Sequence, residues 1–463
     1  MQRFTQIVTE SSEPDQKVAF LSLGCPKATV DSEAIVTELL GQGYDVVDAD
    51  SASEVLVINT CGFIDSARDE SFEAIAQGIA QGRKVIATGC LGAERDLLQA
   101  EFPQLEFISG PAEVRPVVDA VRTYQPARGN PPHTPANAEL GLGGSEARTR
   151  LTPPHYAYIK ISEGCNHKCS FCIIPGMRGK LRSRPLLDIV AEAERAVADG
   201  AQELLLIAQD LSAYGLDLRY EEVTLNGRTV QSNLYELAAA VGAIAPWVRL
   251  HYVYPYPHVD QVIPLMAAGS VLPYLDIPLQ HASPPVLRAM RRPAAAEKTL
   301  ERLQRWREIC PELGIRSTFI VGFPGETDED VGTLLDFLAE AELDRVGCFT
   351  YSAVRGAAAN ALPDAVDERD KLDRQEAVYE VQAAVSARRL QRHVGQRLRV
   401  LVDHVEGAEA FGRSMYDAPD IDGQVHLRDA AGVRAGEFAW VDISAADEHD
   451  LYGDVIGTGL QLV

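Results

Sequence analysis

Three cysteines lie within eight residues near the middle of the chain, at Cys165, Cys169 and Cys172. Three thiolates can ligate three irons of a four-iron cluster and leave the fourth iron open to a chelating substrate, whereas a cluster used only for electron transfer has all four positions closed. A zinc site with His167 as fourth ligand is the alternative, but zinc motifs usually place two of their ligands in a distant segment. The spacing therefore favours an iron-sulfur cluster with one open iron.

Three further cysteines, Cys25, Cys61 and Cys90, are widely spaced, but each comes just after a predicted strand. Because the carboxyl ends of parallel strands converge on one crevice, we expect the three thiols to face each other and to hold a second cluster. A glycine beside each cysteine would let a bulky inorganic group approach the backbone. These glycines are Gly24, Gly62 and Gly89. The alternative is three small core cysteines, since free cysteine is often buried.

The two cysteine sets belong to different parts of a multidomain α/β protein. Residues 17–125 alternate strand and helix patterns and predict a parallel sheet, and residues 126–153, rich in Pro, Gly and Asn, predict a linker. Residues 154–393 contain six strand and helix units, which predict a partial barrel that ends in a long helix. Residues 394–463 are short alternating runs punctuated by Gly and Asp, typical of a small antiparallel barrel.

The composition of the chain indicates in which compartment the protein works and which partners it can bind. No apolar run approaches the roughly 20 residues that span a bilayer, and the N-terminus lacks the features of a secretory signal, so we expect a cytoplasmic protein without disulfides. Cys310 and Cys348 are then expected to be buried apolar residues. The formal net charge of −24 argues against broad binding to phosphate backbones and is compatible with a basic protein partner.

The run from Cys165 to Cys172 after the first barrel strand, with Phe171 before its last cysteine, resembles the radical S-adenosylmethionine superfamily. The resemblance implies that S-adenosylmethionine binds the open iron and is cleaved to a radical that abstracts hydrogen. It also implies cofactor contacts at Phe171, at Gln209 and Asp210 after the second strand, and at Gly322 in the run IVGFPGET. A turn and helix cap at Gln209 and Asp210, and a simple turn at Gly322, are the alternatives.

The domain order and the runs GCPKATVDSE, NTCGFIDSARDES, LDIPLQHASP and GRSMYDAPDIDG resemble the methylthiotransferase family, in particular its ribosomal-protein branch (RimO type). The resemblance implies an OB-like TRAM domain at the C-terminus, two [4Fe-4S] clusters, and S-adenosylmethionine as both methyl donor and radical source. Its implied substrate is the β-carbon of an aspartate in the small-subunit ribosomal protein near the decoding centre, uS12. It further implies an external electron donor and a sulfur donor, and we expect a monomer.

Two other functions remain open at this stage. The tRNA-modifying branch of the same family uses the same clusters, but residues 394–463 carry five arginines, no lysine and thirteen acidic residues, a formal charge of −8 that repels phosphate. A zinc-stabilised RNA-binding protein without catalysis is the second alternative. The chain departs from the ribosomal-protein branch at Ala28, Gly176 and Arg355, and the basic run from Arg178 to Arg184 is most simply a solvated face.

Overall fold

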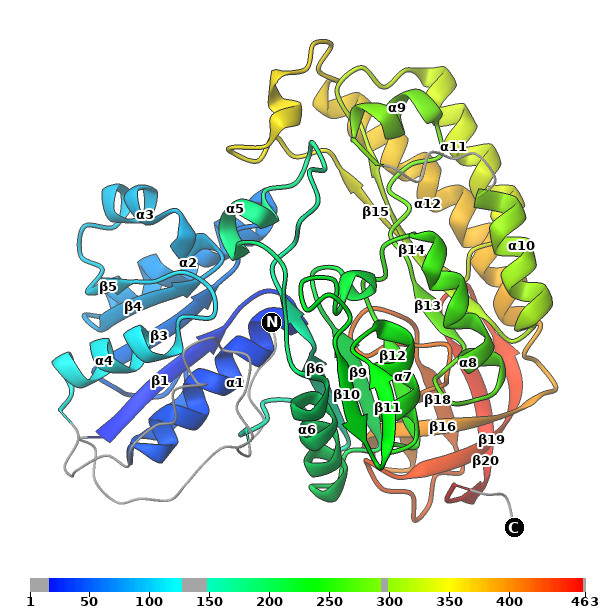
Figure 1. Ribbon diagram of the computed structural model, residues 1–463, viewed down its shortest axis with the longest axis horizontal. Coiled ribbons are helices and arrows are strands. Elements are labelled where there is room, and N and C mark those ends of the chain that lie inside the picture. The colour runs from blue at the N-terminus through cyan, green and yellow to red at the C-terminus, as the bar shows by residue number, and fades with distance from the viewer. Residues whose placement is uncertain (1–15, 127–147, 293–298, 461–463) are drawn as a thin grey trace.

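The computed structural model describes residues 16–126, 148–292 and 299–460, which form three units in chain order (Figure 1). Most of the predicted linker, residues 127–147, lies outside the described residues. None of the described helices combines the length and the apolar character needed to cross a membrane.

The N-terminal unit is a five-stranded parallel sheet in the order β2-β1-β3-β4-β5. Its strands are β1 (Lys17–Ser22), β2 (Asp45–Asp48), β3 (Val55–Thr60), β4 (Lys84–Gly89) and β5 (Phe107–Ile108). Its helices are α1 (Pro26–Gly41), α2 (Asp65–Ala80), α3 (Arg95–Glu101) and α4 (Val114–Tyr124). The predicted parallel sheet is confirmed, but the two short outer strands were not predicted. Helix α1 begins at Pro26, because proline is favoured at the first helical position.

The central unit is a six-stranded, all-parallel open barrel in the order β15-β14-β13-β12-β9-β6, as predicted. Its strands are β6 (Tyr156–Lys160), β9 (Glu203–Ile207), β12 (Trp247–Leu250), β13 (Tyr274–Asp276), β14 (Gly314–Val321) and β15 (Arg345–Thr350). Its outer helices are α6 (Leu186–Ala198), α7 (Leu234–Gly242), α8 (Ile263–Ala267), α9 (Pro284–Ala289), α10 (Thr299–Ile309), α11 (Asp328–Ala341) and α12 (Glu368–Gln391). Cys310 and Cys348 are buried in its core, as expected.

Two short insertions interrupt the barrel pattern. One is a pair of two-residue strands, β7 (Ser162–Glu163) and β8 (Arg182–Ser183), which encloses the cysteine loop and α5 (Ile174–Arg178). The other is the hairpin of β10 (Glu222–Leu225) and β11 (Arg228–Gln231). In Figure 1 the α5 segment lies between the N-terminal sheet and the barrel, so the cysteine loop occupies the junction of the two units.

The C-terminal unit is a closed five-stranded barrel packed against the central unit (Figure 1). Its strands are β16 (Arg397–Glu406), β17 (Glu409–Arg413), β18 (Val425–Arg428), β19 (Phe438–Ala446) and β20 (Leu451–Thr458). The predicted small barrel is confirmed with one difference, since β18 and β20 pair in parallel while the other neighbours are antiparallel. This parallel pair closes the barrel and leaves it without a free edge.

The glycines beside the N-terminal cysteines are required by the protein chain itself. Gly89 ends β4 with a φ of +93°, and a Cβ added there would lie 2.2 Å from Asn59 Oδ1 and 2.6 Å from the Thr60 carbonyl oxygen. At Gly62 an added Cβ would lie 2.9 Å from Leu91 Cα. Close packing of neighbouring turns therefore requires glycine at these two positions.

A buried charge cluster joins the central and C-terminal barrels. Glu203, fully buried at the start of β9, accepts a hydrogen bond from Arg249 Nε at 2.7 Å and also pairs with Arg413 of β17. Arg413 in turn donates to Asp403 at 2.9 Å. Burial would raise the pKa of Glu203, but Arg413 and Arg249 outweigh it and hold that pKa below its ordinary value. One ionised carboxylate thus holds cations from both barrels.

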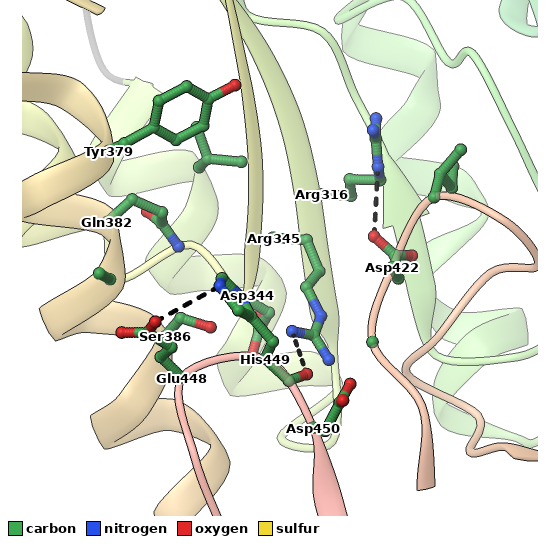
Figure 2. Close-up of a pocket in the computed structure, with 14 residues that line it drawn as sticks. Arg316, Asp344, Arg345, Tyr379, Gln382, Ser386, Asp422, Glu448, His449 and Asp450 are labelled. Atoms are coloured by element: carbon green, nitrogen blue, oxygen red, sulfur yellow. Dashed lines mark hydrogen bonds and ion pairs between the residues drawn. The ribbon is translucent and has the colours of Figure 1, made fainter. Parts of the chain in front are cut away.

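A second contact between the same barrels surrounds a cavity of about 550 Å³ (Figure 2). Arg345 donates to the His449 carbonyl oxygen at 2.9 Å, and Arg316 lies 3.4 Å from Asp422. Both arginines lie near the amino ends of their strands, opposite the end where the cysteines gather. That end of a parallel barrel usually serves stability, so we assign this cavity to the packing of the two barrels.

Replacing Gly89 with alanine tests the packing at the end of β4. We expect Gly89→Ala to lower the free energy of unfolding by roughly 2–5 kcal/mol. A side chain there would strain the left-handed backbone and would overpack the space around it. Gly82→Ala is the control, since Gly82 has a φ of +74° but open space around it, and it should cost about 1 kcal/mol. Thermal unfolding of the iron-free variants measures both, and equal losses would contradict the packing argument.

Glu203→Gln tests the charge cluster between the barrels. The variant leaves two buried arginines without their shared carboxylate, so we expect it to lose roughly 3–5 kcal/mol of stability at pH 7. Because the pKa of Glu203 is lowered in the folded chain, its contribution is present at neutral pH and disappears as the pH falls through that pKa. The difference in thermal midpoint from the unmodified protein should therefore shrink as the pH falls below the ordinary pKa of a glutamate.

Asp442→Asn is the matched control for that measurement. Asp442 pairs with Arg397 at 2.9 Å, but both side chains are about half exposed. Its loss should cost less than about 1 kcal/mol. A Glu203→Gln variant as stable as this control would rule out the proposed role of the cluster.

Candidate active site

The first cysteine set lies on the loop that follows β6 and β7. The backbone N–H groups of His167 and Ile174 point at Cys165 Sγ (3.5 Å) and Cys172 Sγ (3.4 Å). The loop is fastened to α9, because Ser170 donates from its N–H to Met290 O at 3.1 Å and from its hydroxyl to Ala289 O at 2.7 Å. The sulfurs are therefore held by a constrained loop at the carboxyl end of the barrel, where the sequence predicted a site.

The second set comes from three strand ends of the N-terminal sheet. Cys25 follows β1 and precedes α1, Cys61 follows β3, and Cys90 follows β4. Ser71 of α2 accepts a hydrogen bond from the Cys61 N–H and donates to the Cys61 carbonyl oxygen, both at 3.0 Å. A Cβ on Gly24 would lie only 3.2 Å from Cys61 Cβ, which shows how closely the first two strand ends approach. The three thiols thus meet at one crevice, as predicted.

Both sets line one cavity of about 430 Å³ between the two units. All six cysteines contribute to its wall: Cys25, Cys61, Cys90, Cys165, Cys169 and Cys172. Aromatic and cationic side chains complete the lining, among them Tyr252, Tyr254, Lys27 and Arg292. Two thiol sets that are far apart in sequence therefore face a common space large enough for a small molecule.

The thiols differ in how readily they ionise. Burial alone would raise the pKa of Cys25, but the charges of Lys27 and Arg178 hold it below its ordinary value. Burial raises the pKa of Cys90 to about 11, although Arg178 opposes the shift. In the other set, burial raises the pKa of Cys165 to about 11 and that of Cys172 to about 12. Most of these sulfurs would therefore need a bound cation to remain thiolates at neutral pH.

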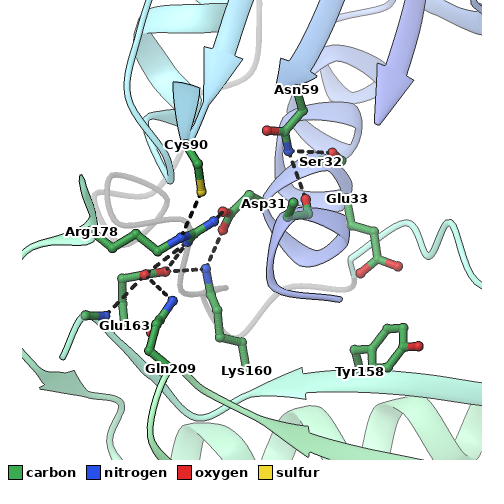
Figure 3. A network of polar contacts seen from close by, with 12 residues as sticks. Asp31, Ser32, Glu33, Asn59, Cys90, Tyr158, Lys160, Glu163, Arg178 and Gln209 are labelled. Carbon is green, nitrogen blue, oxygen red and sulfur yellow. Dashed lines mark hydrogen bonds and ion pairs between the residues drawn. The ribbon is translucent and has the colours of Figure 1, made fainter. Parts of the chain in front are cut away.

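A buried polar network connects Cys90 of the N-terminal unit to the barrel (Figure 3). Arg178 lies at its centre and donates to Cys90 Sγ at 3.3 Å, to Glu163 at 3.0 Å and to Asp31 at 3.0 Å. Lys160 pairs with the same two carboxylates. Side chains of all four charged residues are at most 3% exposed. The basic run was interpreted as a solvated face, and this is wrong for Arg178 and for Arg184, which are both buried.

The predicted cofactor contacts divide into two groups. Phe171 and Gln209 line the shared cavity. Gln209 donates to Glu163 at 2.7 Å, and its Oε1 atom is buried without a hydrogen-bond partner among the described residues. Asp210 instead binds His167 and caps the turn at Ser212. Gly322 is outside the cavity lining, and a Cβ there would lie 2.2 Å from Lys371 Cγ.

The donor groups fit four-iron clusters better than a zinc ion. His167, the fourth ligand that a zinc site would need, is hydrogen-bonded through Nε2 to Asp210 at 2.7 Å and stacks on Tyr254 with ring centroids 3.8 Å apart. In the described part of the chain, no three His, Cys, Asp or Glu side chains are placed to hold a single metal ion. Two sets of three cysteines around one cavity suit larger groups that keep one iron open.

A wider cavity of about 640 Å³ reaches Cys169 and Cys172 from another side. It lies between α3 and the loop after β15, and its wall includes Lys168, Arg291 and Arg355. Gly176, another departure from the family pattern, also lines it. These departures therefore lie beside the thiols without replacing any of them.

Several residues of the site were not predicted from the sequence. Arg292 stacks on the Tyr254 ring at 4.0 Å and lies 3.8 Å from Cys169 Sγ, and Lys27 lies 3.2 Å from the centre of the Tyr252 ring. An aromatic-rich run, HYVYPYPH, follows β12 and was a signal that this strand end is functional. No sequence signal showed which cations would reach it.

Comparison with known proteins agrees with this arrangement. Residues 17–110 match the model of uncharacterized protein family UPF0004, residues 159–338 match the radical SAM superfamily, and residues 394–456 match the TRAM domain. The radical S-adenosylmethionine methyltransferase TsrM of Kitasatospora setae, solved with tryptophan and a SAM analog bound, is similar in fold, with a TM-score of 0.51 and 14% identity over 85% of this chain and 79% of that chain.

Curated relatives cover almost the whole chain. Ribosomal protein uS12 methylthiotransferase RimO of Acidithiobacillus ferrooxidans is 56% identical over 95% of this chain and 98% of that protein. The protein of the same name from Saccharophagus degradans is 53% identical over 96% of this chain and 92% of that protein. Such identity over nearly the full length of both chains, together with the three domain matches, shows that the chain belongs to the RimO family of methylthiotransferases, which are radical S-adenosylmethionine enzymes.

Proposed function

We propose that this chain adds a methylthio group to the β-carbon of an aspartate in ribosomal protein uS12. The single observation that carries the proposal is the shared cavity, because all six predicted ligands line it. An enzyme that both activates a carbon and delivers sulfur to it must hold the two functions on either side of the same atom. The position of the two thiol sets meets that requirement.

Each set of three cysteines would hold one [4Fe-4S] cluster. When bound, the clusters and S-adenosylmethionine supply the radical, the sulfur and the methyl group. The chain's own residues orient and enclose the reactants. Gln209 Oε1, which has no hydrogen-bond partner among the described residues, is placed to accept a hydrogen bond from an amino group in the cavity, and Phe171 and Tyr252 would limit the access of water to it. Contacts at Asp210 and Gly322 stay predictions.

The substrate must reach the space between the thiols. The 640 Å³ cavity that contains Cys169 and Cys172 offers this approach, since it is bordered by both the N-terminal unit and the barrel. Lys168, Arg291 and Arg355 on its wall would attract the carboxylate of the target aspartate. Arg355 would therefore help to orient the substrate of this chain.

The charge of the C-terminal barrel supports a basic protein substrate. Residues 394–463 carry a formal charge of −8, which attracts a lysine- and arginine-rich protein and repels RNA phosphates. The tRNA-modifying function is disfavoured by this charge and by the names of the curated relatives. We further propose an external electron donor, a sulfur donor, a cytoplasmic location and a monomeric enzyme.

Iron content tests the two-cluster assignment. After anaerobic reconstitution we expect about eight irons per chain, and about four after Cys165, Cys169 and Cys172 are all changed to alanine. The matching triple variant of Cys25, Cys61 and Cys90 should also hold about four. Cys310→Ala is the control and should leave the content unchanged, since Cys310 is buried away from the cavity. Zinc in place of iron would contradict the assignment.

An activity assay tests the substrate. The reconstituted enzyme is supplied with S-adenosylmethionine, sulfide and reductant, together with either purified uS12 or unmodified tRNA, and mass shifts are read by mass spectrometry. We expect a methylthio gain on one aspartate of uS12, and its loss in Cys25→Ala and in Cys169→Ala. A gain on tRNA alone would overturn the substrate assignment.

A further inference from the structure

Among the described residues, each thiol set has an arginine in contact with one of its sulfurs, and the two arginines are placed differently. Arg292 lies 3.8 Å from Cys169 Sγ and lines the cavity. Arg178 donates its Nε–H to Cys90 Sγ at the shorter distance of 3.3 Å, and its side chain is only 3% exposed. Its other two nitrogens bind carboxylates of two different units, Asp31 of α1 and Glu163 of β7. One guanidinium therefore contacts a cluster ligand and both halves of the interface.

Because the contact between Arg178 and Cys90 is buried, the charge of Arg178 acts on the sulfur with little screening by water. Arg178, Lys160, Asp31 and Glu163 balance as two cations and two anions. A thiolate at Cys90 adds a negative charge to this balance, and Arg178 is the cation that touches it in the described structure. Hydrogen bonds and charge near the sulfurs are among the factors that set the reduction potential of an iron-sulfur cluster. A buried cation favours the reduced, more negative form.

We propose that Arg178 is a positioning residue that raises the reduction potential of the cluster held by Cys25, Cys61 and Cys90. It does so by donating a charge-assisted hydrogen bond to the Cys90 sulfur while its two carboxylate partners hold the guanidinium in place. The proposal rests on the two-cluster assignment above. It adds that the cluster facing the barrel is tuned by a residue that the barrel supplies.

The test isolates this cluster in the full-length chain. Cys165, Cys169 and Cys172 are changed to alanine, the protein is reconstituted anaerobically, and the midpoint potential is measured by redox titration followed by electron paramagnetic resonance. Adding Arg178→Met should shift the midpoint to a more negative value. Arg178→Lys keeps the charge but loses the forked geometry, so it should give a smaller shift in the same direction.

Two control variants separate tuning from a general loss of packing. Lys180→Met removes a cation from the same loop, where the side chain is exposed, and should leave the potential unchanged. Asp31→Asn removes the negative charge of one partner of Arg178 but keeps a side-chain oxygen that can accept the same hydrogen bond, so it does not release the guanidinium. It should lower the thermal midpoint without making the potential more negative, because it removes a negative charge.

The outcomes distinguish a failure of the role of Arg178 from a failure of the two-cluster assignment. If the starting triple variant binds no iron, the assignment of a cluster to the N-terminal cysteines fails. If it binds iron but Arg178→Met leaves the potential unchanged, the tuning role of Arg178 is wrong. An Asp31→Asn variant whose potential falls as far as that of Arg178→Met would also overturn it, since loosened packing would then explain both shifts.

Discussion

The structure depends on a buried set of opposite charges where two separate sheets meet. Arg178 and Lys160 neutralise Asp31 and Glu163 in a region that water does not reach. Unpaired, any of these charges would be costly to bury. The N-terminal sheet and the barrel therefore have a defined mutual position in which all four are satisfied. In that position the strand ends of both sheets open onto one cavity, and the six thiols face each other.

The same principle operates at the other end of the barrel. Glu203 binds one arginine of its own unit and one of the C-terminal barrel. The apolar contact beside it includes Trp247, Leu272 and Phe438. Charge pairing specifies how the units are oriented, while the apolar surface supplies most of the favourable free energy. Buried carboxylates thus hold the central barrel to both of its neighbouring units, and the site lies at one of these two junctions.

Much of the fold and of the site could be predicted because parallel strands impose a simple rule. Cysteines that directly follow strands must gather at one edge, so Cys25, Cys61 and Cys90 could be grouped despite their spacing. The short strands Asp45–Asp48 and Phe107–Ile108 were missed because two to four residues carry little periodic signal. Arg178 was wrongly predicted to be exposed, because its burial depends on a second unit that packs over it. No local sequence pattern indicates that packing. A cofactor contact at Asp210 stays a prediction, and in this structure the side chain of Asp210 binds His167.

The placement of the N-terminal thiols also bears on how the protein is made. All three come from strand ends within residues 17–108, whereas Arg178 and the barrel thiols follow later in the chain. Synthesis proceeds from the N-terminus, and early units can fold before later ones emerge. The crevice that we propose to hold a cluster can therefore form while its arginine and the opposing barrel are still untranslated. If these thiols bind iron as proposed, the timing of iron delivery relative to translation becomes part of the protein's maturation.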